Sequence, residues 1–246
     1  MITLLVACAG SSGPWMGPPV RRPQPQPGEN PEPLTTALWS LLVEDPTGTA
    51  LPGLTVDIHR GASSMRSSTD ADGRLTAELE PGPLAAEVSD ANGAWMTATF
   101  VFEVEAGDEV EHAIVLPQAP SGTSLPNPAD FVDIGDGLLV NVGADDVSPP
   151  PFEPPTSTLA AVRADLPFNQ EPIVASWLLA PYRYTATMPA RFDIDHGLPD
   201  GTVVEVWQPD LAVVAWQRVG ELEVVGSQLE GPVQLEATVP VILVER

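Results

Sequence analysis

The chain of 246 residues carries 34 acidic and 10 basic side chains, which gives a formal net charge of −24 at pH 7. Every basic residue is an arginine, and so acidic a chain argues against a nucleic-acid partner, since that binding relies on Lys and Arg at phosphates. The hydrophobic content of 43% is enough for folded cores, while 29 prolines and 20 glycines oppose long helices and favour strands joined by turns. One cysteine excludes a disulfide within the chain.

The first notable stretch in chain order is Leu5-Val6-Ala7-Cys8, which holds the only cysteine. It resembles the lipobox of bacterial lipoproteins, and this resemblance implies removal of a signal segment, residues 1–7, and diacylation at Cys8. The protein would then be exported and held by lipid in the bacterial cell envelope, at the outer membrane or cell surface. Residues 1–7 are too short for a secretory signal and lack a basic residue, so we expect further residues upstream. The alternative is a buried free cysteine in an N-terminal strand.

A proline-rich segment, residues 8–33, follows the cysteine and includes Pro23-Gln24-Pro25-Gln26-Pro27. Alternating proline fixes φ and removes amide donors, so this segment favours extended polyproline II. We expect a disordered, semi-rigid stalk that separates the folded part from the membrane. A polyproline ligand for a partner domain is the alternative.

Residues 34–117 show the period of two that is typical of strands. Alternating apolar residues begin with Ala37, Trp39, Leu41 and Val43, and turn signals such as Asp70-Ala71-Asp72-Gly73 recur between the runs. About seven short strands with regular turns predict an antiparallel β-sandwich. Asp70 and Asp72 fit a turn better than a calcium loop, which needs six to eight oxygen ligands.

The runs 43–48, 51–56 and 69–75 resemble the carboxypeptidase regulatory-like domain, a transthyretin-like sandwich related to carbohydrate-binding-like folds. The resemblance covers about residues 35–117. It implies a stalk, spacer, adhesion or carbohydrate-contact module rather than a catalytic unit.

Residues 118–130 are rich in Pro, Ser and Gly and predict a linker. Residues 131–246 then predict a second β-sandwich with a β-meander, and a proline cluster at 148–157 predicts a surface loop. The pattern Pro199-x-Gly-Thr-x-Val-x-Val-Trp207, with Trp216 and Gly220 after it, is similar to the β-sandwich module of ankyrins and netrin-receptor tails. In that family the module is structural or mediates protein contacts.

No catalytic, cofactor or metal motif emerges from the residues. The three histidines, His59, His112 and His196, have no zinc-ligand spacing. Carboxylate pairs such as Asp145-Asp146, or Asp193 with Asp195, are weak evidence for glycosidase chemistry in so acidic a chain. A phosphate loop with lysine is also absent from the sequence, so no small-molecule cofactor is expected.

The tryptophans are the best candidates for ligand contact, because aromatic rings stack on sugars. Trp207 and Trp216 lie in strands whose alternation is mixed, so the pattern leaves both a core position and an exposed platform open. We therefore expect an all-β, non-catalytic, membrane-anchored protein of the cell envelope that acts as a structural, protein-interaction or adhesion module. A carbohydrate-binding module is the second hypothesis, and a hydrolase is the third. The expected partners are the membrane and an envelope protein or glycan.

Overall fold

The computed structural model of the protein describes residues 35–168 and 172–246. Within these ranges the chain forms strands and turns, with one short 3-10 helix, η1 (Ala144–Asp146). The predicted all-β class is therefore confirmed. No helix in this part of the chain is long and apolar enough to cross a membrane. Cys8 and the stalk predicted over residues 8–33 lie outside the described residues.

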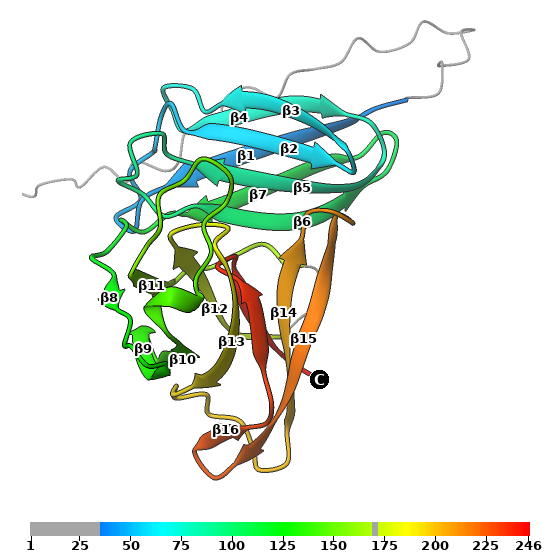
Figure 1. Ribbon diagram of the computed structural model, residues 1–246. Coiled ribbons are helices and arrows are strands. Elements are labelled where there is room, and N and C mark those ends of the chain that lie inside the picture. Colours follow the sequence, from blue (N-terminus) through cyan, green and yellow to red (C-terminus); the bar gives the residue numbers. More distant parts are fainter. Residues whose placement is uncertain (1–34, 169–171) are drawn as a thin grey trace, which may run out of the picture. The chain divides into compact units, whose positions relative to one another are not determined.

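The first sandwich consists of two sheets (Figure 1). Its strands are β1 (Ala37–Glu44), β2 (Thr55–Arg60), β3 (Ser63–Ser68), β4 (Arg74–Leu79), β5 (Gly82–Ser89), β6 (Ala98–Val104) and β7 (Glu109–Val115). One sheet has the order β4-β1-β7 and the other β3-β2-β5-β6. β1 pairs antiparallel with β4 but parallel with β7, so the first sheet is mixed, whereas the sequence predicted antiparallel pairing throughout.

Strand β1 shows how the apolar alternation builds the core of this sandwich. Ala37, Trp39, Leu41 and Val43 are buried while the residues between them are half-buried, as period two predicts. The Trp39 ring stacks on Phe102 with ring centroids 5.1 Å apart. Its indole Nε1 donates a hydrogen bond of 2.9 Å to His112 Nδ1 on β7. A fully buried indole N–H is thereby satisfied.

Three aspartates close turns of this sandwich in the same way. Asp70 Oδ1 accepts hydrogen bonds from the backbone N–H groups of Asp72 and Arg74, which confirms the turn predicted here. Asp45 and Asp90 likewise accept from backbone N–H groups two and four residues further on. Gly73 in the first of these turns has φ +68°, and an added Cβ would lie 2.6 Å from the carbonyl oxygen of Val43. Glycine is therefore required at that position.

The second sandwich has a four-stranded and a seven-stranded sheet. Its strands are β8 (Thr123–Ser124), β9 (Asp130–Gly135), β10 (Leu138–Val142), β11 (Thr158–Arg163), β12 (Ile173–Ala180), β13 (Thr185–Phe192), β14 (Val203–Asp210), β15 (Ala215–Val225), β16 (Gln228–Glu230), β17 (Gln234–Ala237) and β18 (Val241–Glu245). The orders are β17-β13-β10-β9 and β16-β15-β14-β18-β12-β11-β8. The two sheets enclose a core around Trp177, which is fully buried.

The central strands of the seven-stranded sheet are buried on both faces. Trp177 and Leu179 point into the core of the second sandwich, whereas Leu178 belongs to the cluster that contains the core of the first. β18 shows the same division, with Val241 and Leu243 on one side and Ile242 on the other. The outer face of this sheet is therefore covered by the first sandwich.

Three segments between the long strands shape the second sandwich. β9 and β10 form a hairpin that turns back at Gly135–Gly137. β13 begins at Thr185, after a corner with a cis Ala180–Pro181 bond. The segment 118–130, which the sequence predicts as a linker, is held by hydrogen bonds. It contains β8, which pairs with β11, and Ala119 N–H donates to the carbonyl oxygen of Ala94.

Candidate functional site: the junction of the sandwiches and its cleft

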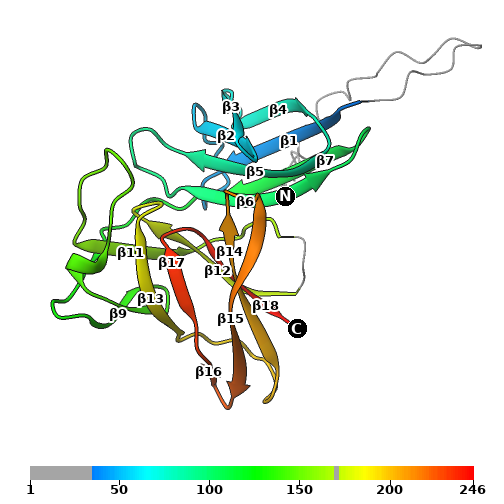
Figure 2. The same cartoon turned by 45° about the vertical axis from the view of Figure 1, so that its right-hand side comes forward.

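The junction is formed by the outer faces of two sheets, one from each sandwich. Figures 1 and 2 show β5 and β6 beside the ends of β14 and β15. On the first sandwich the apolar members are Ala85 and Val101, which cluster with Val214 before β15. On the second they are residues such as Leu178 and Ile242, both fully buried. Burial of this apolar surface favours association of the two sheets.

A row of polar side chains crosses the sheet β3-β2-β5-β6 at the junction. Arg66, Asp57, Glu87 and Thr99 lie opposite one another on successive strands. Arg66 donates two hydrogen bonds to Asp57, from Nε to Oδ1 at 2.8 Å and from Nη2 to Oδ2 at 2.9 Å. These bonds hold the pKa of the Asp57 carboxyl below its ordinary value. The carboxylate of Asp57 is thus satisfied although the residue is buried.

The corner between β12 and β13 completes this row from the second sandwich. Arg183 Nη2 lies 2.8 Å from Glu87 Oε2, and the Tyr182 hydroxyl is hydrogen-bonded to Thr99 Oγ1. His59 Nε2 lies 3.9 Å from the same Glu87 oxygen. Burial raises the pKa of the Tyr182 phenol, so its hydroxyl stays protonated. One ion pair, between Arg183 and Glu87, therefore crosses the junction beside the Arg66–Asp57 pair of the first sandwich.

Trp216 and Trp207 lie on the outer face of the seven-stranded sheet, and both are half-buried. Trp216 Nε1 donates a hydrogen bond of 3.2 Å to the carbonyl oxygen of Val101 on β6. Phe168 packs against both rings, with centroids 4.9 Å from Trp216 and 6.1 Å from Trp207. The Trp207 Nε1 is buried and forms no hydrogen bond with a described residue. Both indoles thus contact the junction rather than stand free of it.

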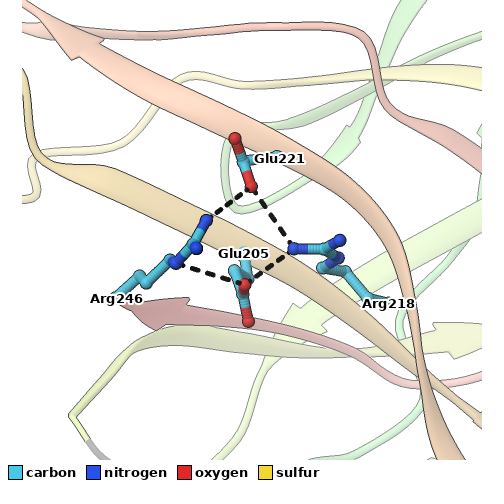
Figure 3. Close-up of polar contacts among 4 residues, drawn as sticks. All are labelled: Glu205, Arg218, Glu221 and Arg246. Atoms are coloured by element: carbon cyan, nitrogen blue, oxygen red, sulfur yellow. Dashed lines mark hydrogen bonds and ion pairs between the residues drawn. The ribbon is translucent and has the colours of Figure 1, made fainter.

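Figure 3 shows a charged network of Glu205 on β14, Arg218 and Glu221 on β15, and Arg246 after β18. Arg218 is the cross-strand partner of Trp207. Arg218 Nη1 lies 2.9 Å from Glu205 Oε1 and 3.3 Å from Glu221 Oε2. Arg246 Nη1 lies 3.2 Å from the same Glu221 oxygen, and its Nε lies 4.0 Å from Glu205. Two positive and two negative groups alternate, so the network is neutral and its charges are turned toward one another. Networks of this kind stabilise more than isolated surface pairs do.

The histidines named from the sequence are far apart and have separate roles. His112 accepts the Trp39 hydrogen bond, and burial lowers its pKa, which favours the neutral acceptor. His196 Nδ1 accepts from the backbone N–H of Leu198. The described residues hold no group of three or more His, Cys, Asp or Glu that could bind a metal ion.

Of the two carboxylate pairs named from the sequence, one makes local hydrogen bonds and the other is exposed to solvent. Asp145 accepts from Asn127 Nδ2, and Asp146 accepts from Gly143 N–H at the start of η1. Asp193 and Asp195 are exposed.

A cleft of about 420 Å³ opens beside the junction, between segments of both sandwiches. Its aromatic walls are Trp95 from the first sandwich and Tyr182 and Tyr184 from the second. The remaining lining residues are small, apolar or hydroxylated, and none of them is charged: Gly93, Met96, Thr97, Ala119, Pro120, Gly122, Pro154, Pro155, Thr156, Thr158, Ala160, Leu179, Ala180 and Pro181. Sequence reasoning did not single out this cleft, because its walls come from four separate stretches.

The proline cluster beside the cleft forms a surface loop, as predicted. Its base is fixed by paired backbone hydrogen bonds between Ser148 and Thr185 and by the Tyr184 hydroxyl, which donates to the carbonyl oxygen of Pro154. Phe152 at its tip is fully exposed and has φ +73°. A bulky residue with positive φ is strained, so this loop presents its aromatic ring at a conformational cost.

No protein-family model matches the sequence, and no curated protein is similar to it. Solved structures with some similarity include Klebsiella pneumoniae 5-hydroxyisourate hydrolase, at 22% identity over 34% of this chain and 92% of that chain, with a TM-score of 0.29. A DUF3823 family protein from Parabacteroides merdae is 12% identical over 86% and 92% of the two chains, with a TM-score of 0.29. BcpA, the major pilin subunit of Bacillus cereus, is 13% identical over 85% and 57%, with a TM-score of 0.30. None of these similarities assigns an activity or a partner to this chain.

Proposed function

We propose that the protein is a non-catalytic component of the bacterial cell envelope, anchored by lipid at Cys8, in which two joined sandwiches form one rigid structural and protein-interaction module. The observation that carries the proposal is the junction. Buried Asp57 is paired with Arg66 on the neighbouring strand, and Glu87 of the first sandwich is paired across the junction with Arg183 of the second. Such pairing favours a scaffold.

The position of the tryptophans also supports a scaffold over a sugar platform on Trp207 and Trp216. A platform needs an open ring face, whereas Phe168 packs against both indoles and Trp216 is hydrogen-bonded to β6. Their contacts are those of residues that join two sheets.

The anchor is tested by expressing the chain with a complete signal segment in a bacterium and analysing the mature N-terminus by mass spectrometry. We expect cleavage before Cys8, a mass increase of a diacylglycerol, and partition into detergent, since two acyl chains anchor stably. The matched Cys8→Ser variant should remain in the aqueous phase. Identical partition of the two proteins would contradict the proposal.

A further inference from the structure

We propose that the cleft beside the junction binds a proline-rich segment of a partner protein that has basic residues next to its prolines. This inference rests on the proposed function, because it names the class of partner that the interaction module would take. It is carried by the chemistry of the lining residues, by the fixed walls of the cleft, and by the acidic residue next to it.

The cleft differs from the rest of the surface in charge. The chain has 34 acidic residues, yet none of the residues that line the cleft is charged. The half-buried rings of Trp95 and Tyr182 are set among four prolines, Pro120, Pro154, Pro155 and Pro181, whereas Tyr184 is only 4% exposed. Grooves lined by aromatic rings are the usual binding sites of polyproline II helices, whose pyrrolidine rings pack between them. The lining therefore fits an uncharged, proline-rich occupant.

The supply of hydrogen-bond donors decides between a peptide and a sugar. The Tyr182 hydroxyl is bonded to Thr99, and the Tyr184 hydroxyl donates to Pro154, so neither is free for a ligand. The Trp95 indole N–H forms no hydrogen bond with another described residue, and the hydroxyl-bearing Thr97 also lines the cleft. A saccharide would leave many hydroxyl groups unpaired in such a cleft, at a cost in free energy. A polyproline segment lacks amide donors and needs only a donor or two for its carbonyl groups.

The walls of the cleft are held in place before any partner binds. Ala119 N–H donates to the carbonyl oxygen of Ala94 beside Trp95, and Leu125 N–H donates to that of Ser157. The bond from Tyr184 to Pro154 fixes the third wall. A polyproline helix is itself ordered, so little conformational entropy is lost when the two associate.

An acidic residue lies next to the cleft rather than inside it. Glu153 is exposed and directly precedes the lining residue Pro154. Together with the net charge of −24, Glu153 favours a partner that carries arginine or lysine beside its prolines.

The test is titration of the full chain with a synthetic peptide of ten prolines flanked by two arginines, followed by tryptophan fluorescence and calorimetry. We expect saturable binding that Trp95→Ala weakens by about tenfold or more. Trp95→Phe, which keeps an aromatic face, should weaken it less. Because Trp95→Ala removes core contacts as well, Ala119→Arg is the second variant: this exposed lining residue would obstruct the cleft and repel the peptide, and the fold should be retained.

Met65→Ala, at an exposed position on β3, is the matched control and should bind as the wild type does. Cellohexaose and chitohexaose form the sugar arm of the titration. Absence of peptide binding overturns the inference, as does peptide binding that both cleft variants leave unchanged, or Trp95-dependent binding of a sugar alone. Each of these results leaves the lipid anchor at Cys8 and the junction between the sandwiches intact, so failure here is distinct from failure of the proposed function.

Discussion

Replacement of Trp216 by alanine tests whether this residue joins the two sandwiches. The change removes the hydrogen bond from the indole to Val101, the contact with Phe168, and packing against the small cluster of Ala85, Val101 and Val214. Complete burial would make Trp→Ala cost about 3–5 kcal/mol. Trp216 is half-buried, so we expect about half of that from packing and about 1 kcal/mol from the hydrogen bond. The expected loss of unfolding free energy is therefore about 3 kcal/mol.

The two contributions are separated by Trp216→Phe, which keeps an aromatic ring but has no N–H donor. We expect this variant to lose about 1 kcal/mol, the usual net value of one hydrogen bond. Val213→Ala, at a nearby position that is 59% exposed, is the control and should change stability by less than about 0.5 kcal/mol. Urea unfolding followed by far-UV circular dichroism measures all three. A Trp216→Ala protein as stable as the control would refute the assignment of Trp216 to the junction.

Three further predictions follow from the described side chains. Arg66 holds the folded-state pKa of Asp57 below 3.8, so the pair stabilises the protein above that pH, and this contribution is lost as the pH falls through the lower folded-state pKa. In the Asp57→Asn variant the unfolding free energy should therefore fall less steeply in acid than in the wild type. An unchanged pH profile would contradict this. Burial raises the pKa of Tyr182 and Tyr184, the two tyrosines of the chain, above 10.0. Their ultraviolet absorbance should therefore show ionisation near pH 10 in denaturant but only at higher pH in the folded protein, and stability should fall above pH 10; equal titration in both states would refute it. Phe152→Asn should raise the unfolding free energy by about 1 kcal/mol, because asparagine tolerates the positive φ at this exposed tip; destabilisation in thermal unfolding would be the opposite result.

The first sandwich was predictable because its local signals agree with its tertiary structure. Apolar alternation in β1 matches burial residue by residue, and the Asp-x-x-Gly turn at residues 70–73 is stabilised by the side chain that predicted it. The parallel partner of β1 could not be predicted in this way. Alternation shows which face of a strand is buried but contains no information about the direction of the neighbouring strand.

The faces of Trp207 and Trp216 stayed ambiguous because the seven-stranded sheet is covered on both sides. Alternation identifies a strand face only when one side meets solvent. Continuous burial over residues 241–244 and 175–179 accompanies nearly uninterrupted apolar runs. Such runs are typical of strands buried on both faces, and they are the signal from which a covered outer face could have been predicted. A register shift between Val206 and Trp207 further disturbs the pattern.

The cleft could not be predicted from the sequence for a different reason. Trp95, Pro120, Pro155 and Tyr182 are separated by long stretches of chain and meet only after the two sandwiches pack together. The spacing of residues in a motif does not show that such distant residues come together in the fold.

Differential scanning calorimetry of the full chain tests most directly whether the two sandwiches form one rigid unit. If the junction through Glu87, Arg183 and Trp216 joins them as described, the protein should unfold in a single transition whose calorimetric enthalpy equals its van't Hoff enthalpy. Two resolved transitions, or a calorimetric enthalpy close to twice the van't Hoff value, would show that the sandwiches unfold independently and would contradict the account.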